Sequence, residues 1–110
     1  MSDSALAALA VQYWKLCEAF ARELDFASAD RVQAGEAQLR FARRRLETIL
    51  TDAGLRLVTY DGAPFTPEIP ASPVNAEDVG PGAVVGTTIE PTITAGGSVL
   101  IAGKILLKEI

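Results

Sequence analysis

The segment TDAGLRLVTYDG, residues 51–62, marks the point at which the character of the chain changes. Residues 4–53 before it contain no proline and one glycine, whereas all six prolines and seven of the nine glycines lie from Gly62 onward. Glycine tolerates the left-handed conformation in which many helices end, so Gly54 is predicted to terminate a helix. We therefore expect an α+β protein, with a helical dimerisation region over residues 1–54 and a small, mainly β domain over residues 55–110.

Apolar residues of the helical region recur at alternating steps of three and four, which is typical of helices that pack along a seam. Steps of three and four repeat every seven residues. Twelve residues separate Phe20 from Val32, which is not a multiple of seven, so the two stripes are out of phase. We therefore expect a break at residues 25–30, where Asp25, Ser28 or Asp30 caps a second helix, and Ser4 caps the first. This pattern predicts an antiparallel helical hairpin, and a single kinked helix is the alternative.

A lone hairpin covers only part of two such stripes, and 49% of the residues are apolar in a chain of only 110. Small domains bury a limited fraction of their surface. We therefore expect two copies to pair as a dimeric four-helix bundle. Cys17 is expected as a buried apolar residue, and Trp14 in the core or at the subunit interface. The predicted dimer interface comprises Leu9, Tyr13, Leu16, Phe20, Leu39 and Leu46.

The second half of the chain is rich in branched residues between turn signals, so strands are predicted over residues 55–60, 83–89 and 98–108, with a further short strand around Val74. Turns are expected at residues 61–62 and 95–97, and the second is placed to close a hairpin. The prolines between residues 64 and 73 hold the intervening segment extended, because each fixes φ and removes an amide donor.

The composition gives no support to catalysis. The chain has no histidine and one cysteine, its carboxylates lack the spacing of a calcium loop, and its glycine-rich segments lack the ending of a phosphate loop. We expect no enzyme, no cofactor and no metal site. A net charge of −4 argues against a nucleic-acid partner. The longest apolar runs are far shorter than the ~20 residues of a membrane span, so we expect a cytoplasmic protein without a membrane partner.

Four arginines concentrate in the second predicted helix, at residues 40, 43, 44 and 45. Glu36 and Glu47 lie four residues from Arg40 and Arg43, so ordinary ion pairs on a solvated helix face explain part of this patch. The alternative is electrostatic docking of Arg40, Arg43 and Arg44 against an acidic partner, which mainly speeds and orients association.

The order of landmarks after Gly54 resembles the β-domain of GrpE proteins, the nucleotide-exchange co-chaperones of DnaK-type chaperones. The resemblance covers residues 46–110. Its motifs follow one another as Gly-Leu (54–55), Gly-Ala-Pro-Phe-Thr-Pro (62–67), Glu-Asp-Val-Gly-Pro-Gly-Ala-Val (77–84) and Gly-Ser-Val-Leu (97–100). The chain departs from the family at residues 70–74 and at Ile101, where the family pattern has an arginine.

This resemblance implies a homodimer whose β-domain inserts as a wing into the nucleotide-binding domain of a DnaK-type ATPase and releases ADP, with no covalent chemistry. The alternative is a GrpE-fold adaptor or scaffold that has lost exchange activity. We expect residues 79–82 to form an exposed docking turn, and the alternative for Phe65 is a plug of the small β core. The resemblance assigns partner binding to Gly54, Phe65, Pro67, Val79, Pro81 and Gly82.

Overall fold

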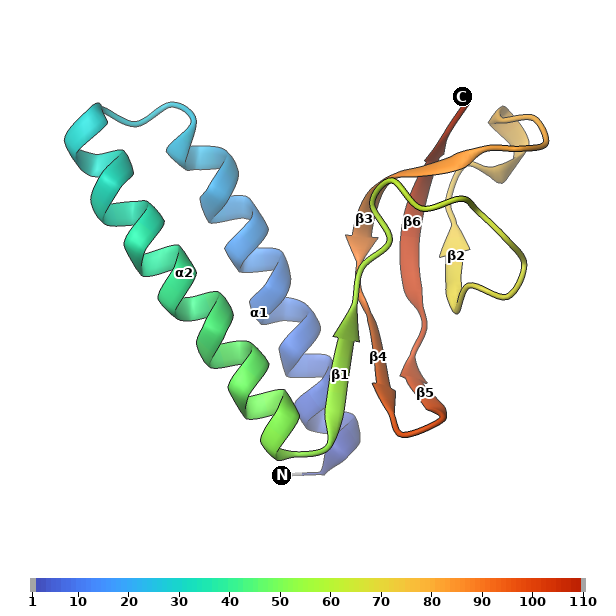
Figure 1. Cartoon of the computed structure of the whole chain (residues 1–110), viewed down its shortest axis with the longest axis horizontal. Coiled ribbons are helices and arrows are strands. Elements are labelled where there is room, and N and C mark those ends of the chain that lie inside the picture. The colour runs from blue at the N-terminus through green and yellow to red at the C-terminus, as the bar shows by residue number, and fades with distance from the viewer. Residues whose placement is uncertain (1, 110) are drawn as a thin grey trace. The chain divides into compact units, whose positions relative to one another are not determined.

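The structure is a computed structural model that describes residues 2–109, and it divides at Gly54 into two units (Figure 1). The helical unit spans Met1–Gly54 and the β unit spans Leu55–Ile110. Helices fill the first unit and short strands the second, which confirms the predicted α+β class.

The helical unit is an antiparallel hairpin of α1 (Asp3–Leu24) and α2 (Ala29–Asp52) (Figure 1). The chain reverses between them through backbone hydrogen bonds from the amide of Asp25 to Arg22 O and from that of Phe26 to Glu23 O. The predicted break at residues 25–30 is therefore confirmed, and the alternative of one kinked helix is wrong.

The helix ends differ in part from the prediction. Ser2, not Ser4, caps α1, since its hydroxyl accepts a hydrogen bond of 3.2 Å from the amide of Ala5. Ser28 occupies the cap position of α2, but its hydroxyl donates to Oδ1 of Asp30 (2.9 Å) instead of accepting from a helix amide. Gly54 follows α2 with φ +76°, which confirms the predicted left-handed glycine at that helix end.

The hairpin packs small side chains of α1 against larger ones of α2. One contact reverses this pattern, because Gly35 of α2 lies directly against the end of the Leu24 side chain of α1, which would have to shift to admit a Cβ atom. The buried residues are Ala7, Ala10, Val11 and Cys17 on α1 and Gly35, Leu39, Leu46 and Leu50 on α2.

The β unit contains two three-stranded sheets, in the orders β1-β4-β5 and β2-β6-β3. All neighbours are antiparallel except β2 and β6. Residues 62–65 run beside β3, because the amide of Gly62 donates to Val85 O (2.8 Å) and that of Phe65 to Ala83 O (3.1 Å). The strands are β1 (Leu55–Val58), β2 (Ala71–Pro73), β3 (Val84–Glu90), β4 (Thr92–Ala95), β5 (Ser98–Ile101) and β6 (Gly103–Lys108), with a 3₁₀ turn η1 (Ala76–Asp78) before β3.

Two strand predictions need correction. The segment 98–108 is not one strand, because Ala102 separates β5 from β6 and these strands belong to different sheets. Residues 92–95, for which no strand was predicted, form β4. The turn expected at residues 95–97 does close the β4–β5 hairpin, with Gly96 at φ +60°. The short strand expected around Val74 is β2, which ends at Pro73.

A buried hydroxyl ties the β unit together. Thr92 is fully buried, and its Oγ accepts hydrogen bonds from the Tyr60 hydroxyl (2.9 Å) and the Gly103 amide (3.1 Å) while donating to Pro70 O (2.8 Å). These bonds join segments that are far apart in sequence and satisfy the one polar side-chain group of Thr92. The apolar core beside them consists of Ala83, Val85, Ile105 and Leu107.

Candidate binding surfaces

One face of the helical hairpin exposes large apolar side chains. Leu16 is 71% exposed, Leu9 52% and Phe20 39%. An apolar groove of about 320 Å³ runs between the helices on this face. Of the six predicted interface residues, four line this groove, whereas Leu46 is buried and Leu9 lies outside the lining. The groove is lined by Tyr13, Leu16, Cys17, Phe20, Gln38, Leu39 and Ala42.

The stripe predicted on α1 is therefore not the main packing face within the hairpin, although its Tyr13 donates a hydrogen bond of 3.1 Å to Ala42 O on α2. Alanines and Cys17 occupy that face, while Leu9, Leu16 and Phe20 point away from it. Small side chains let two helices approach closely, and this leaves the bulky stripe uncovered. The sequence does contain the signal, because Ala7, Ala10, Trp14, Cys17, Ala21 and Leu24 also follow steps of three and four.

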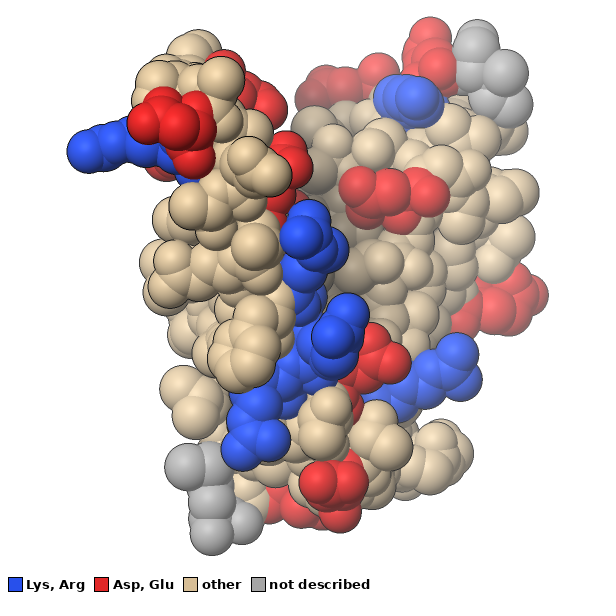
Figure 2. Space-filling view, turned by 60° about the vertical axis from the view of Figure 1, so that its left-hand side comes forward, with Lys and Arg blue, Asp and Glu red and all other residues tan. Residues whose placement is uncertain are grey.

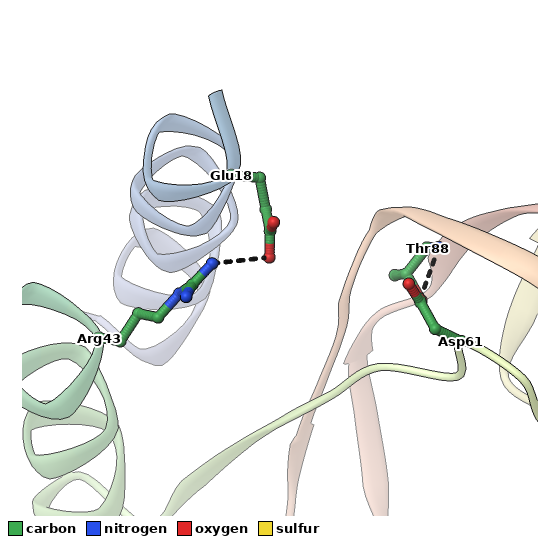
Figure 3. A network of polar contacts seen from close by, with 4 residues as sticks. All are labelled: Glu18, Arg43, Asp61 and Thr88. Carbon is green, nitrogen blue, oxygen red and sulfur yellow. Dashed lines mark hydrogen bonds and ion pairs between the residues drawn. The ribbon is translucent and has the colours of Figure 1, made fainter. Parts of the chain in front are cut away.

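The arginine patch lies on α2, one of the two helices that line the groove, and Figure 2 shows basic side chains gathered in a run on the helical unit. Arg40, Arg43, Arg44 and Arg45 are all exposed. Arg43 reaches across the hairpin to Glu18, with 3.5 Å between Nη2 and Oε1 (Figure 3). Arg40 and Arg43 also line a second groove together with Asp25 and Glu36. Acidic neighbours therefore offset part of the patch.

Cys17 lies at the base of the apolar groove and is buried. Burial raises the pKa of its thiol above the ordinary value, and the nearby Glu18 carboxylate adds to this effect, while the Arg43 guanidinium opposes it. The thiol is thus held in its neutral form, which is the less reactive one.

The β unit places the predicted partner-binding residues in two different settings. Phe65 and Val79 are half-buried and pack against the core, so the alternative position of Phe65 as a core plug is the one observed. The expected exposed turn at residues 79–82 is correct for Gly80, Pro81 and Gly82 and wrong for Val79. Pro67 is exposed, and Gly54 lies at the junction between the two units.

The exposed turn is held at both ends. Val79 and Ala83 anchor its flanks in the core. The Gly80 amide donates to Oε1 of Glu109 (3.2 Å), and Gly82 adopts φ +82°, a conformation that favours glycine. A second turn is fixed by Asp61, whose carboxylate accepts hydrogen bonds from the Thr88 hydroxyl (Figure 3) and the Thr88 amide, the latter at 2.8 Å.

A further exposed surface was missed at the level of the sequence. On the outer face of the β2-β6-β3 sheet, Leu106 is 41% exposed opposite Thr87 of β3, and Lys104 and Lys108 flank it along β6. The sequence does indicate this surface, because exposed residues Lys104, Leu106 and Lys108 alternate with buried Ile105 and Leu107. The alternation was overlooked because residues 98–108 were interpreted as one continuous strand.

Among residues 2–109, no three His, Cys, Asp or Glu side chains lie close enough together to hold a metal ion. None of the helices in this range is long and apolar enough to cross a membrane.

The chain matches no model of a known protein family, and no curated protein is similar to it.

Proposed function

We propose that the chain is a GrpE-like co-chaperone, which acts as a homodimer, binds the nucleotide-binding domain of a cytoplasmic DnaK-type ATPase and promotes ADP release. The observation that carries this proposal is the pairing of two features in one chain. The helical unit exposes an apolar groove suited to self-association, and the β unit presents a stiff, exposed turn within the motif order that resembles GrpE.

The turn at Gly80–Gly82 supports the binding role because its shape is set before any partner arrives. Core contacts hold both flanks, Pro81 has a fixed φ, and the Glu109 carboxylate holds the Gly80 amide. A surface that is already ordered loses little conformational entropy on binding. Phe65 and Val79 then act by supporting this turn from the core, and Pro81 and Gly82 form the contact.

The groove supports the dimer because its lining residues Leu16 and Phe20 are exposed to water when the chain is a monomer. Covering apolar surface contributes roughly 25 cal/mol per Å² removed from water. A dimer of this kind delivers two β units to the partner. The arginine patch, with Arg44 fully outside the groove, is placed to speed association with an acidic surface.

Exchange follows from differential affinity. A protein that binds the open, nucleotide-free state of an ATPase better than the closed state shifts the equilibrium by that difference alone. Linkage makes the effect reciprocal, so ADP must weaken binding of the chain by the same factor by which the chain weakens binding of ADP.

Isothermal titration calorimetry tests this reciprocity with the isolated nucleotide-binding domain of the DnaK-type ATPase from the same cell. Exchange activity predicts that saturating ADP weakens binding of the chain at least tenfold. Pro81→Glu should weaken binding further, and Pro67→Ala serves as the control at another exposed proline. Equal binding with and without ADP would refute the exchange function.

The second candidate is an adaptor that keeps the fold without exchange. The exposed Leu106 on β6 favours it, because this apolar side chain is not part of the turn at residues 80–82 and offers a docking site of its own. Ile101 in place of the family's arginine favours it as well. An adaptor binds its partner with no dependence on ADP and loses binding in Leu106→Asp but not in Pro81→Glu.

A further inference from the structure

Phe41 is a large aromatic side chain on α2 that the hairpin leaves in water, with 69% of its surface exposed. Gln38, three residues before Phe41, lines the apolar groove, and the lining residue Ala42, next to Phe41 in sequence, gives the level of the groove along α2. Residues three apart on a helix are surface neighbours. Phe41 therefore lies beside the groove, on the same side of α2 and at the same level along the hairpin.

The groove has the size and chemistry to accept a phenyl ring. A cavity of roughly 150 Å³ is enough to hold benzene, and the groove measures about 320 Å³. None of the seven residues that line it carries a charge. Its wall residues Leu16 and Phe20 offer apolar and aromatic contacts, and aromatic pairs contribute beyond the area they bury.

We propose that Phe41 of one copy fills the groove of a second copy, and that the second copy returns the same contact. This rests on the dimer of the proposed function and identifies the side chain that locks it. A two-fold interface places each surface patch against its own counterpart, so a projecting side chain and its recess must occur on one face of one chain. Phe41 and the groove meet that requirement.

The positions of Phe41 and the groove also determine how the two hairpins of the dimer are oriented relative to each other. Because Phe41 and the groove lie at the same level, reciprocal insertion needs a two-fold axis that runs along the helices. The two hairpins then point the same way. A two-fold axis across the helices would bring Phe41 of each copy against Phe41 of the other and leave both grooves empty.

A second copy is a better occupant than a charged partner. The uncharged lining gives an acidic or basic peptide no ion pair, whereas the second groove of the hairpin carries Asp25, Glu36, Arg40 and Arg43. The charged groove is therefore the one suited to a charged ligand, and the apolar groove to Phe41.

Sedimentation equilibrium tests the energetic part. Phe41→Ala is expected to raise the dimer dissociation constant at least tenfold, with an unchanged circular dichroism spectrum because the side chain is mostly exposed in one copy. Arg44→Ala, an exposed residue of the same helix, is the matched control and should change the constant less than twofold. An unchanged constant in Phe41→Ala would overturn the proposal.

The position of the contact is tested by cross-linking, since Cys17 is the only cysteine of the chain. In Phe41→Cys, mild oxidation should give a covalent dimer on a non-reducing gel. Mass spectrometry should find tryptic peptides 16–22 and 41–43 joined by a disulfide. Arg44→Cys is the control and should not form a disulfide with Cys17.

The outcomes separate this inference from the dimer itself. A dimer by sedimentation without the 17–41 linkage overturns the Phe41 contact and leaves the dimer standing. A monomer at tens of micromolar overturns both. A 17–41 linkage in a covalent dimer, with no partner ATPase present, supports the contact independently of exchange activity.

Discussion

Replacing Gly103 by alanine should damage the β unit severely, because the added Cβ has nowhere to go. It would lie 2.7 Å from Glu90 O, 2.8 Å from Oγ1 of Thr92 and 3.1 Å from the Thr92 amide nitrogen. Two of these are backbone atoms in paired strands, and the third is the buried hydroxyl that binds Tyr60, Pro70 and Gly103. None of the three can swing aside as a flexible side chain would.

The expected loss follows from these contacts. Overpacking a tight site costs about 1–3 kcal/mol, and each disrupted hydrogen bond at Thr92 adds about 1 kcal/mol. A total of about 3 kcal/mol is comparable to the whole stability of a unit this small, at roughly 0.05–0.15 kcal/mol per residue. For a domain of this size it lowers the melting temperature by about 12–24 °C.

Urea titration followed by circular dichroism in the strand region measures this loss. Gly97→Ala is the matched control, because no atom lies within 4 Å of its added Cβ, and it should change stability by less than about 0.5 kcal/mol. If Gly103→Ala unfolds at the same urea concentration as Gly97→Ala, the close packing of β6 against the β3–β4 connection is refuted.

Four other changes test separate parts of the structure. Thr92→Val should destabilise the β unit by about 1–3 kcal/mol because it removes three hydrogen bonds and takes from the Tyr60 hydroxyl its partner, whereas Thr92→Ser should retain most of the stability; equal melting curves would contradict the role of this hydroxyl. Leu16→Asp should yield a folded monomer by light scattering, since Leu16 is exposed, while Leu46→Asp should unfold the helical unit by circular dichroism, since it buries an unpaired charge. The raised pKa of Cys17 means that the folded state disfavours the thiolate, so the free energy of unfolding should fall as the pH rises above about 8.5. Urea titrations at pH 8 and 10 measure this loss, and Cys17→Ala should remove the part of it that comes from the thiol. Pro81→Glu should leave the melting temperature within about 3 °C of the wild type, because Pro81 is exposed, while Val79→Asp should lower it by more, since Val79 packs on the core; equal melting temperatures would place Val79 outside the core.

The sequence predicted the parts of the fold that local rules determine. Gly54 ends α2 as expected because only glycine enters the left-handed region without strain, and the break at residues 25–30 follows from the phase shift between Phe20 and Val32. The cap of α1 was predicted at Ser4 and lies at Ser2, because either serine can begin the same run of helical residues. The hydrogen bond from the Ala5 amide to the Ser2 hydroxyl identifies Ser2 as the cap.

Packing decided what the sequence could not. Leu9, Leu16 and Phe20 have the spacing of a seam, but the alanines on the neighbouring face allow closer approach of α2 and so form the contact within the hairpin. The split of residues 98–108 escaped prediction because Ala102 continues an apolar run, and only the contacts of Gly103 with Glu90 and Thr92 show why the strand must change sheets there. The half-burial of Val79 also depends on tertiary packing, because the core it packs against includes Ile105 and Leu107, which are far from it in sequence.

The rate of nucleotide release tests the proposed function most directly. A fluorescent ADP analogue is bound to the DnaK-type ATPase of the same cell and chased with excess unlabelled nucleotide in a stopped-flow instrument, with increasing amounts of the chain. The account predicts that release accelerates at least tenfold and saturates, and that Pro81→Glu loses the acceleration while remaining folded. Release at the uncatalysed rate in the presence of saturating wild-type chain, bound to the ATPase by calorimetry, would contradict it.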